Sequence, residues 1–349
     1  MPQQGSLELK ILTFIIPAYN SAVYLDKCIS SMLVPEVLEK LEIIIVNDGS
    51  TDATEEIAQS YCSRFPDTVC LICQENRGHG GALNTGCAAA RGKYLKVIDA
   101  DDWAETQNLP EFLMLLENCD SDVVLTHHKT IDICTGEVKK WRSYPEAFGK
   151  NNSFGKILAD WKGFDRSLTF HGITYRTAFY QEYGIQLSEH VFYEDHEFAT
   201  FPCCHARGVT CFDLFLYNYR IGDVNQSVSD TNQLRRIGHV ETVLRRMTEE
   251  YGKLPDSNGK QYAALKIQGL LLSYLTTALL LNPDRKEGRL LAERVMEACY
   301  SEVPEVYGQV RGKYAVFYLM NCLHIHKKTW DWVLSSRVYN RLRKKHAFE

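Results

Sequence analysis

Three aspartates directly follow an apolar run and are the side chains best placed to do chemistry. The run covers residues 94–98, and Asp99, Asp101 and Asp102 come after it. Carboxylates this close together repel one another, and burying an unpaired charge is costly. Mg²⁺ and Mn²⁺ prefer carboxylate oxygens and keep open positions for phosphate. The pattern therefore predicts a divalent cation that carries a phosphate group, with a solvated acidic turn as the alternative.

Polar clusters also follow three other apolar runs. They are Pro17-Ala18-Tyr19-Asn20, Asn47-Asp48-Gly49-Ser50, and the segment from Gln74 to Gly86. Ligands of open α/β sheets bind outside the carboxyl ends of the strands, so we expect the four clusters to meet in one crevice. Tyr19 offers a flat face suited to a base.

The glycines of the third cluster do not form a known phosphate loop. Gly78, Gly80 and Gly81 are followed by Leu83, which breaks the G-x-G-x-x-G pattern, and no Walker lysine follows. We instead expect a nucleotide held by scattered contacts, with its diphosphate neutralised by a metal on the carboxylates. A metal-bound nucleoside diphosphate that must leave favours group transfer from an activated sugar.

The elements that position these clusters alternate between strand and helix. Strands are expected at 9–16, 41–46, 68–73, 94–98 and 122–126, and helices near 22–33, 52–64, 81–90 and 108–117. This alternation is typical of a Rossmann-like α/β fold, with a mostly parallel sheet covered by helices on both faces. Residues 144–165 are expected to form a loop excursion. After about residue 232 the sequence predicts helices, one with an apolar face at Val240, Val243 and Met247.

Composition places the chain among ordinary globular proteins. Its 349 residues are 45% hydrophobic and carry a net charge of -5, which argues against a nucleic-acid partner. Twelve scattered cysteines are expected to be free thiols in a reducing cytosol. The N-terminus lacks the pattern of a signal peptide. The longest apolar run, 269–281, is shorter than the roughly 20 residues of a spanning helix, so we expect a buried core helix and a cytoplasmic protein.

The N-terminal 130 residues resemble an inverting family 2 glycosyltransferase with the GT-A fold. The resemblance lies in Pro17-Ala18-Tyr19-Asn20, Asn47-Asp48-Gly49-Ser50-Thr51-Asp52, Asn76-Arg77-Gly78 with Asn84-Thr85-Gly86, and Asp99-Ala100-Asp101-Asp102. It continues more weakly to about residue 230. It implies a catalytic domain over 1–230, with a nucleotide-binding half at 1–126 and an acceptor half at 127–230. A helical region at 231–349 has no matching motif.

The resemblance also implies an activity. The enzyme would move a hexose or N-acetylhexosamine from a UDP-sugar to a hydroxyl of a glycan, glycolipid or glycoprotein, with inversion and with Mg²⁺ or Mn²⁺. A nucleotidyltransferase is one alternative, but it would want a glycine-rich basic loop after the first strand. A non-catalytic sugar-nucleotide-binding scaffold is another, and it would predict loss of Asp195 or of the aspartate pair.

The donor-binding set that the resemblance implies is large. It comprises Pro17, Ala18, Tyr19, Asn20, Asp48, Asn76, Arg77, Asn84, Asp99, Ala100, Asp101 and Arg220. Ala18, Tyr19 and Asp48 would hold the uracil. Asp101 would coordinate the metal, and Asp99 would contact the ribose or the metal shell. Where the family often has arginine this chain has Leu83, and Arg77 or His79 could replace that contact.

The acceptor side depends on a second acidic motif. In the resemblance, Asp195 would be the general base that takes a proton from the incoming hydroxyl, with Glu194 in support. His171 is either an acceptor contact or a structural histidine. Arg220 would pair with the diphosphate. It belongs to the segment 217–229, which includes Gln226, Ser227 and Ser229 and would close over the donor.

The C-terminal tail, 327–345, is basic with interleaved aromatic residues such as Trp330 and Trp332. Such a segment can lie on an anionic membrane surface, which would make the protein peripheral on the cytoplasmic face. Two other interpretations stay open: a solvated terminal helix packed by its own apolar side chains, and a contact that forms a homo-oligomer.

Overall fold

The computed structural model describes residues 10–142, 149, 152, 169–222 and 230–329. Most of the expected loop at 144–165, Gln226, Ser227 and the tail from Trp330 onward lie outside these residues. The described chain forms two compact units. The first contains Met1–Val224 with Asp256–Tyr262, and the second contains Asn225–Pro255 with Ala263–Glu349. We expected the boundary at residue 230, and the structure divides the chain after Val224.

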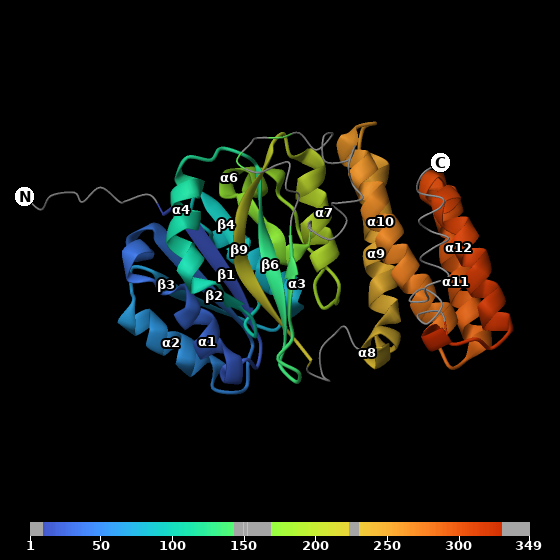
Figure 1. Cartoon of the computed structure of the whole chain (residues 1–349), viewed down its shortest axis with the longest axis horizontal. Coiled ribbons are helices and arrows are strands. Elements are labelled where there is room, and N and C mark those ends of the chain that lie inside the picture. Colours follow the sequence, from blue (N-terminus) through green and yellow to red (C-terminus); the bar gives the residue numbers. More distant parts are fainter. Residues whose placement is uncertain (1–9, 143–148, 150–151, 153–168, 223–229, 330–349) are drawn as a thin grey trace, which may run out of the picture. The chain divides into compact units, whose positions relative to one another are not determined.

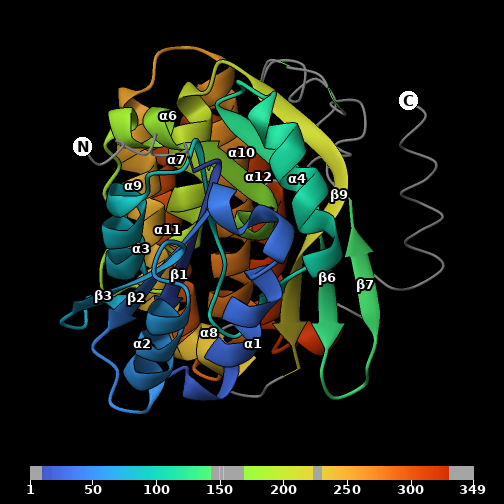
Figure 2. The ribbon, with the colours of Figure 1, turned by 90° about the vertical axis from the view of Figure 1, so that its left-hand side faces the viewer.

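A nine-stranded sheet forms the centre of the first unit (Figures 1 and 2). Its order is β3-β2-β1-β4-β8-β6-β9-β5, and β7 pairs with β6. The strands are β1 (Leu12–Ala18), β2 (Leu41–Asp48), β3 (Val69–Gln74), β4 (Tyr94–Val97), β5 (Trp103–Ala104), β6 (Val123–Asp132), β7 (Val138–Trp141), β8 (Ile173–Arg176) and β9 (Val209–Ile221). β3, β2, β1 and β4 are parallel, as predicted, so their carboxyl ends meet at one edge.

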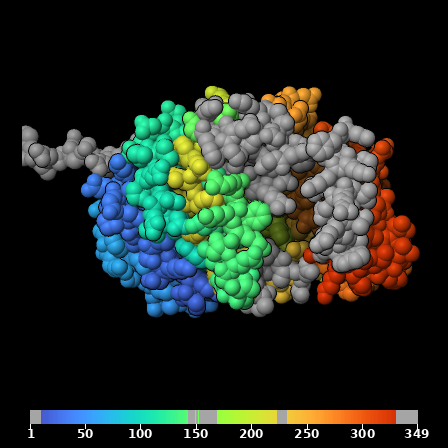
Figure 3. Space-filling model, viewed as in Figure 1, coloured from blue at the N-terminus to red at the C-terminus, as the bar shows by residue number. Residues whose placement is uncertain are grey.

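The other part of the sheet is mixed. β8 pairs antiparallel with both β4 and β6, and β6 pairs parallel with β9. β9 in turn pairs antiparallel with the short β5 that follows the acidic triplet. β6 and β7 form a hairpin on the surface beside β9, in green and yellow in Figure 3. This arrangement carries β9 to the same end of the sheet as the triplet.

Helices cover both faces of the sheet. They are α1 (Ala22–Met32), α2 (Thr54–Arg64), α3 (Gly78–Ala89), α4 (Leu109–Glu117), α6 (Thr177–Tyr183) and α7 (Asp195–His205), with short 3-10 turns at Pro35–Lys40, Thr106–Asn108 and Phe170–Gly172. The first four agree closely with the predicted ranges. Successive side chains of β1 point to opposite faces of the sheet. Phe14 and Ile16 pack with α1, α2 and α4 on one face, whereas Ile15 packs with α3, α6 and α7 on the other.

The second unit is helical. It contains α8 (Asp230–Arg235), α9 (Ile237–Lys253), most of α10 (Asn258–Thr276), a π-helical turn (Thr277–Leu281), α11 (Arg285–Glu302) and α12 (Pro304–Cys322). The predicted apolar face of α9 is buried at Val240, Val243 and Met247. One helix, Asn258–Leu281, is long and apolar enough to cross a membrane, and 56% of its most apolar window is buried inside the structure. A buried core helix passes the same test.

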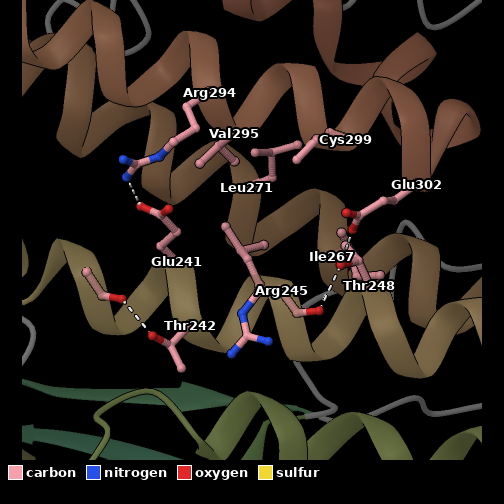
Figure 4. Close-up of a pocket in the computed structure, with 13 residues that line it drawn as sticks. Glu241, Thr242, Arg245, Thr248, Ile267, Leu271, Arg294, Val295, Cys299 and Glu302 are labelled. Atoms are coloured by element: carbon pink, nitrogen blue, oxygen red, sulfur yellow. Dashed lines mark hydrogen bonds and ion pairs between the residues drawn. The ribbon is translucent and has the colours of Figure 1, made fainter.

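A cavity of about 410 Å³ lies between α9, α10 and α11. Figure 4 shows two polar bridges from α9 to α11 beside it. Arg294 donates to Glu241 at 2.6 Å, and Thr248 donates to Glu302 at 2.8 Å. The floor is formed by buried apolar side chains of the three helices: Leu244, Ile267, Leu271 and Cys299.

Candidate active site

The parallel strands β1 and β2 end side by side, and each is followed by polar groups. Pro17 and Ala18 are buried at the end of β1. Tyr19 follows with 53% of its surface exposed, so its ring is available to stack on a base. Asn20 adopts a positive φ of 48°, and its side-chain carbonyl accepts the Thr51 N–H at 2.8 Å. This bond ties the loop after β1 to the loop after β2.

Asp48, the last residue of β2, is 2% exposed. Its Oδ1 accepts the Gln74 side-chain amide at 2.7 Å and the Arg77 N–H at 2.8 Å. The Asn76 side chain donates to the Asp48 carbonyl at 3.0 Å. Within the described residues Oδ2 has no hydrogen-bond partner. One carboxylate oxygen is thus held in place, and the predicted contact of Asp48 with a base N–H would have to use the other.

The start of α3 fixes a segment that lies far along the chain. Gly78 has φ +76°, and a Cβ there would lie 2.8 Å from the His190 nitrogen, so only glycine fits. The Arg77 guanidinium pairs with Glu189. The Asn84 side chain donates to the Leu187 carbonyl at 3.0 Å and accepts the Leu187 N–H at 2.8 Å. Because both ends of its amide are engaged, these bonds argue against a donor contact by Asn84.

The acidic triplet forms a tight cluster just after β4. Asp99, Asp101 and Asp102 each offer a carboxylate oxygen, and these atoms lie within 4.8 Å of one another. Asp102 is 1% exposed, and it accepts the Tyr217 hydroxyl at 2.6 Å and the Arg220 N–H at 2.7 Å. Asp102 therefore fastens the triplet to β9, whereas Asp99 and Asp101 are partly exposed.

Negative charge is crowded at this cluster. Burial, and then the charge of Asp99, raises the pKa of Asp101 to about 6. Burial and both neighbouring carboxylates raise the pKa of Asp102 well above its usual value. The nearest guanidinium, Arg220, has its Nη1 3.8 Å from Asp101 Oδ2, which is a weak contact. The predicted role of Arg220 beside a diphosphate is compatible with this position.

These residues fit a hard divalent cation. Mg²⁺ and Mn²⁺ take oxygen ligands, and the three carboxylates place such oxygens within 4.8 Å of one another. Asp102 already accepts a hydrogen bond on each oxygen, so Asp101 and Asp99 are the groups left to hold an ion. Ala100 between them is 5% exposed and packs in the core, whereas its two neighbours are partly exposed.

His79 joins the triplet to the acceptor-side motif. Its Nε2 lies 2.9 Å from Asp99 Oδ1, and its Nδ1 bonds Glu194 Oε1. Burial alone would lower the pKa of His79, but hydrogen bonds and charges from the two carboxylates raise it well above its usual value. Burial would likewise raise the pKa of Asp99, and the bond from His79 lowers it instead. One imidazolium thus clamps two carboxylates from distant parts of the sequence.

Asp195 is the first residue of α7 and follows Glu194 directly. Glu194 is 3% exposed and precedes the helix, whereas Asp195 is partly exposed. Asp195 is close enough to His171 and Tyr219 to influence the titration of both. The predicted base therefore lies in the same site as Asp99, linked to it through Glu194 and His79.

His171 occupies an aromatic setting. Its ring centroid lies 4.3 Å from that of Tyr219 and 4.9 Å from that of Tyr217. Burial lowers the pKa of His171 to about 4. Among the described residues its Nδ1 has no hydrogen-bond partner although it is buried. The structure thus presents a neutral imidazole next to Asp195, and both interpretations of His171 stay open.

Three further site residues were not predicted as such. The sequence predicted His79 only as a possible replacement for the arginine in whose place this chain has Leu83. The glycines on both sides of His79, Gly78 and Gly80, were the available sign that another segment packs closely here. Tyr217 donates to Asp102 and accepts the Asp99 N–H at 3.1 Å. Lys96 lies buried in β4 and donates to the His171 carbonyl at 2.9 Å. The alternating tyrosines of β9 were the available signal for Tyr217.

The chain is similar to glycosyltransferases in sequence. Residues 13–183 match the model described as glycosyl transferase family 2. EpsH of Bacillus subtilis, a glycosyltransferase by name, is 29% identical over 220 residues, which are 62% of each chain. YibD of Escherichia coli, named an uncharacterized glycosyltransferase, is 37% identical over 134 residues, or 38% of each chain. The chain thus covers less than two thirds of the length of these relatives.

Solved structures show the same architecture. The crystal structure of residues 1–349 of Staphylococcus aureus TarS in complex with UDP-GlcNAc superposes with a TM-score of 0.64 at 18% identity. The match covers 89% of this chain and 90% of the TarS chain. At this identity the likeness establishes a shared fold. The predicted GT-A architecture with a helical C-terminal region is confirmed.

Proposed function

Over residues 13–183 the chain belongs to glycosyl transferase family 2, and from this premise we propose that it transfers a hexose or N-acetylhexosamine from a UDP-sugar to a hydroxyl of a glycan, glycolipid or glycoprotein. The UDP-GlcNAc complex of TarS supports a uridine donor. The exposed ring of Tyr19 and the free oxygen of Asp48 suit a uracil base.

The observation that supports this proposal most is the clamp at His79. It connects Asp99, on the donor side, to Glu194, which directly precedes Asp195. Transfer with inversion requires one base on the face of the sugar opposite the leaving diphosphate. A fixed link between the aspartate pair and the start of α7 keeps the donor-side carboxylates and the proposed base at a constant distance from each other.

In this mechanism Asp195 acts as the general base. The acceptor hydroxyl oxygen attacks the anomeric carbon and forms the new C–O bond, while its proton passes to the Asp195 carboxylate. The bond from the anomeric carbon to the diphosphate breaks, and its electron pair leaves on UDP. His79 and Glu194 orient the segment that carries the base. The rings of Tyr217 and Tyr219 pack against His171 on this side of the site, where they would limit the access of water.

Asp101 and Asp99 would hold Mg²⁺ or Mn²⁺, which when bound supplies positive charge to the donor diphosphate. Arg220 adds a second positive group on the same side. Asp102 keeps the triplet loop attached to β9 through Tyr217, so that Asp99 and Asp101 face the donor.

A cytoplasmic location with peripheral contact to the cytoplasmic face of a membrane is part of this proposal. Its support is the basic, aromatic-rich sequence from Lys327 onward, which suits an anionic surface. A homo-oligomer formed through the same tail is the alternative.

The first test is UDP release from a panel of UDP-hexoses and UDP-N-acetylhexosamines with Mn²⁺. One donor is expected to be turned over or hydrolysed. If no donor releases UDP, the proposal is refuted.

The second test is Asp195→Asn, which keeps the size of the side chain. We expect it to retain UDP binding by calorimetry and to lose at least about a hundred-fold in transfer, the usual scale of general base catalysis. Unchanged transfer would exclude Asp195 as the base.

A further inference from the structure

A second polar hollow lies in the helical unit, where α11 begins and α12 ends. Its volume is about 910 Å³. We call it the cationic cup and define it by Arg285, Lys286, Arg289, Cys322, His324 and His326. Three permanently charged cations thus line one hollow. Its only acidic lining residue in the described part of the chain is Asp284, whose carboxylate caps α11 by accepting the N–H groups of Lys286 and Glu287.

The guanidinium of Arg285 is buried without a counterion. Arg285 is 8% exposed, its Nη1 donates to the Leu279 carbonyl at 2.8 Å, and its Nη2 lies 2.7 Å from Nδ1 of His326. A guanidinium carries no acceptor, so Nδ1 must accept this bond with a lone pair. Neither acceptor is negatively charged. In the described residues no carboxylate lies within ion-pair distance of Arg285, and a buried charge of this kind is costly unless an anion joins it.

Arg289 repeats the pattern one turn further along α11. Its Nη1 donates to the side-chain carbonyl of Asn321 at 2.7 Å, which is again a neutral acceptor. No described carboxylate forms an ion pair with it. Lys286 is exposed at the same hollow. The cup therefore offers a cluster of donors with positive charge in excess, and a phosphate group is the ligand chemistry that matches guanidinium donors best.

Apolar side chains next to the cup indicate where the phosphate comes from. Leu319 and Leu323 stand one turn apart on the end of α12, beside Cys322, and are 59% and 61% exposed. Leu290, which follows Arg289 on α11, is 59% exposed. Leu290 follows Arg289 and Leu323 follows Cys322, so both are chain neighbours of residues that line the cup. Exposed leucines around cationic side chains are typical of a surface that meets lipid headgroups and the upper acyl region.

We propose that the cationic cup binds the phosphate of an anionic lipid headgroup, with Leu290, Leu319 and Leu323 entering the membrane interface. The arginines and Lys286 hold the phosphate oxygens, and the leucines provide the apolar contact that a soluble phosphate lacks. This site consists of described residues alone and is separate from the tail contact above. It does not depend on the proposed sugar transfer.

The experiment measures flotation of the full-length protein with two kinds of vesicle. One contains phosphatidylglycerol and phosphatidylcholine in equal parts, and the other contains phosphatidylcholine alone. The test variant combines Lys286→Gln with Arg289→Gln and leaves the buried Arg285 in place. We expect its partition to the anionic vesicles to fall about thirty-fold, as the loss of two surface cations predicts. The matched control combines Arg311→Gln with Lys313→Gln, which removes two exposed cations elsewhere on α12, and it should partition more strongly than the test variant.

Two further measurements decide between sources of phosphate. A Leu319→Ser and Leu323→Ser variant should lose vesicle binding while its response to inorganic pyrophosphate in calorimetry stays that of the wild type. If the cup variant loses pyrophosphate binding but floats like the wild type, the ligand is a soluble phosphate and the lipid assignment is overturned. Equal flotation of the cup variant and the control variant with Arg311→Gln and Lys313→Gln would also overturn it. UDP release by the cup variant should be unchanged, which separates this result from the fate of the proposed transfer.

Discussion

His79 lies between two carboxylates that are 95 residues apart in sequence, since Asp99 and Glu194 each bond one nitrogen of its ring. The two ring nitrogens point in different directions, so the imidazole fixes the two carboxylates on opposite sides of itself. A Cβ at Gly80, next to His79, would lie 2.1 Å from the Ser188 carbonyl oxygen. Only glycine therefore allows the two backbone segments to come this close. The small residues around His79 therefore serve the clamp by letting α3 lie against the segment before α7.

Asp101 and Asp102 differ in role despite being neighbours. We expect Asp101→Asn to weaken UDP binding in Mn²⁺ by ten-fold or more, because loss of one carboxylate leaves Asp99 alone to hold the ion. Calorimetry with and without Mn²⁺ checks this, and wild-type affinity in Mn²⁺ would contradict it. Asp102→Asn is the control. It should lower the unfolding midpoint by disturbing the bond to Tyr217, yet keep the effect of Mn²⁺ on UDP binding.

At the scale of elements, α3 is the helix that brings the site together. Its start carries Arg77 to Asp48 and His79 to Asp99, and its middle lies directly on the sheet. At Gly86 an added Cβ would be 2.4 Å from Ile15 Cγ2 and 3.2 Å from Val46 Cγ2. Contact this close means that the position of α3, and hence of His79, depends on glycine at this turn.

We expect Gly86→Ala to lower the free energy of unfolding by about 1–3 kcal/mol, the usual cost of overpacking a core. Urea unfolding followed by circular dichroism measures it. Gly269→Ala in α10 is the matched control, because a Cβ there meets nothing within 4 Å. It should stabilise its helix by about 0.5–1 kcal/mol. A Gly86 variant at least as stable as the wild type would show that α3 can shift away from β1.

β4 carries a buried lysine whose titration affects stability. Burial lowers the pKa of Lys96 to about 7, whereas an unfolded lysine titrates near about 10.4. Between these values the unfolded chain binds more protons, so this residue makes stability rise with pH from about 7 to about 10. The slope would approach about 1.4 kcal/mol per pH unit.

Lys96→Met should flatten this slope, whatever its own stability. Urea unfolding of both proteins at pH 7 and pH 9 gives the difference directly. The two carbonyls that Lys96 bonds, His171 and Ile173, lose their donor in the variant, so an overall loss of stability is expected as well. Identical pH dependence in the two proteins would mean that Lys96 remains charged when folded.

At the scale of the whole molecule, the sequence was most informative about the parallel half of the sheet. Runs such as 41–46 are apolar throughout, which marks strands buried on both faces, and the polar clusters at their ends were correctly placed at one edge. The insertion of β8 between β4 and β6 could not be predicted, because it is an antiparallel pairing between segments about 80 residues apart. Asp102 and Tyr217 directly precede the paired residues Trp103 and Asn218 of β5 and β9, a long-range pairing that the sequence did not predict either.

The second, helical unit could be predicted only in part. The apolar face of α9 was readable from its spacing. A return of Asp256–Tyr262 to the first unit was not predicted. Tyr262 packs in the core of that unit and donates to the Ala199 carbonyl at 2.8 Å. The two residues are far apart in the sequence, so no local pattern predicts this contact. The assignment of Asp256–Tyr262 to the first unit thus depends on long-range contacts such as this one, which the spacing of apolar residues does not reveal.

Two compact units, each with its own core, predict two unfolding transitions in calorimetry. The residues proposed to bind the donor all lie in the first unit, so UDP with Mn²⁺ should raise the midpoint of one transition and leave the other in place. At ligand concentrations about 100 times the dissociation constant, the stabilisation would be about 2.7 kcal/mol. Asp101→Asn, with UDP binding ten-fold weaker or more, should reduce this stabilisation to about 1.4 kcal/mol or less without merging the transitions. A single transition that moves as a whole with ligand would instead mean that the two units unfold as one cooperative body.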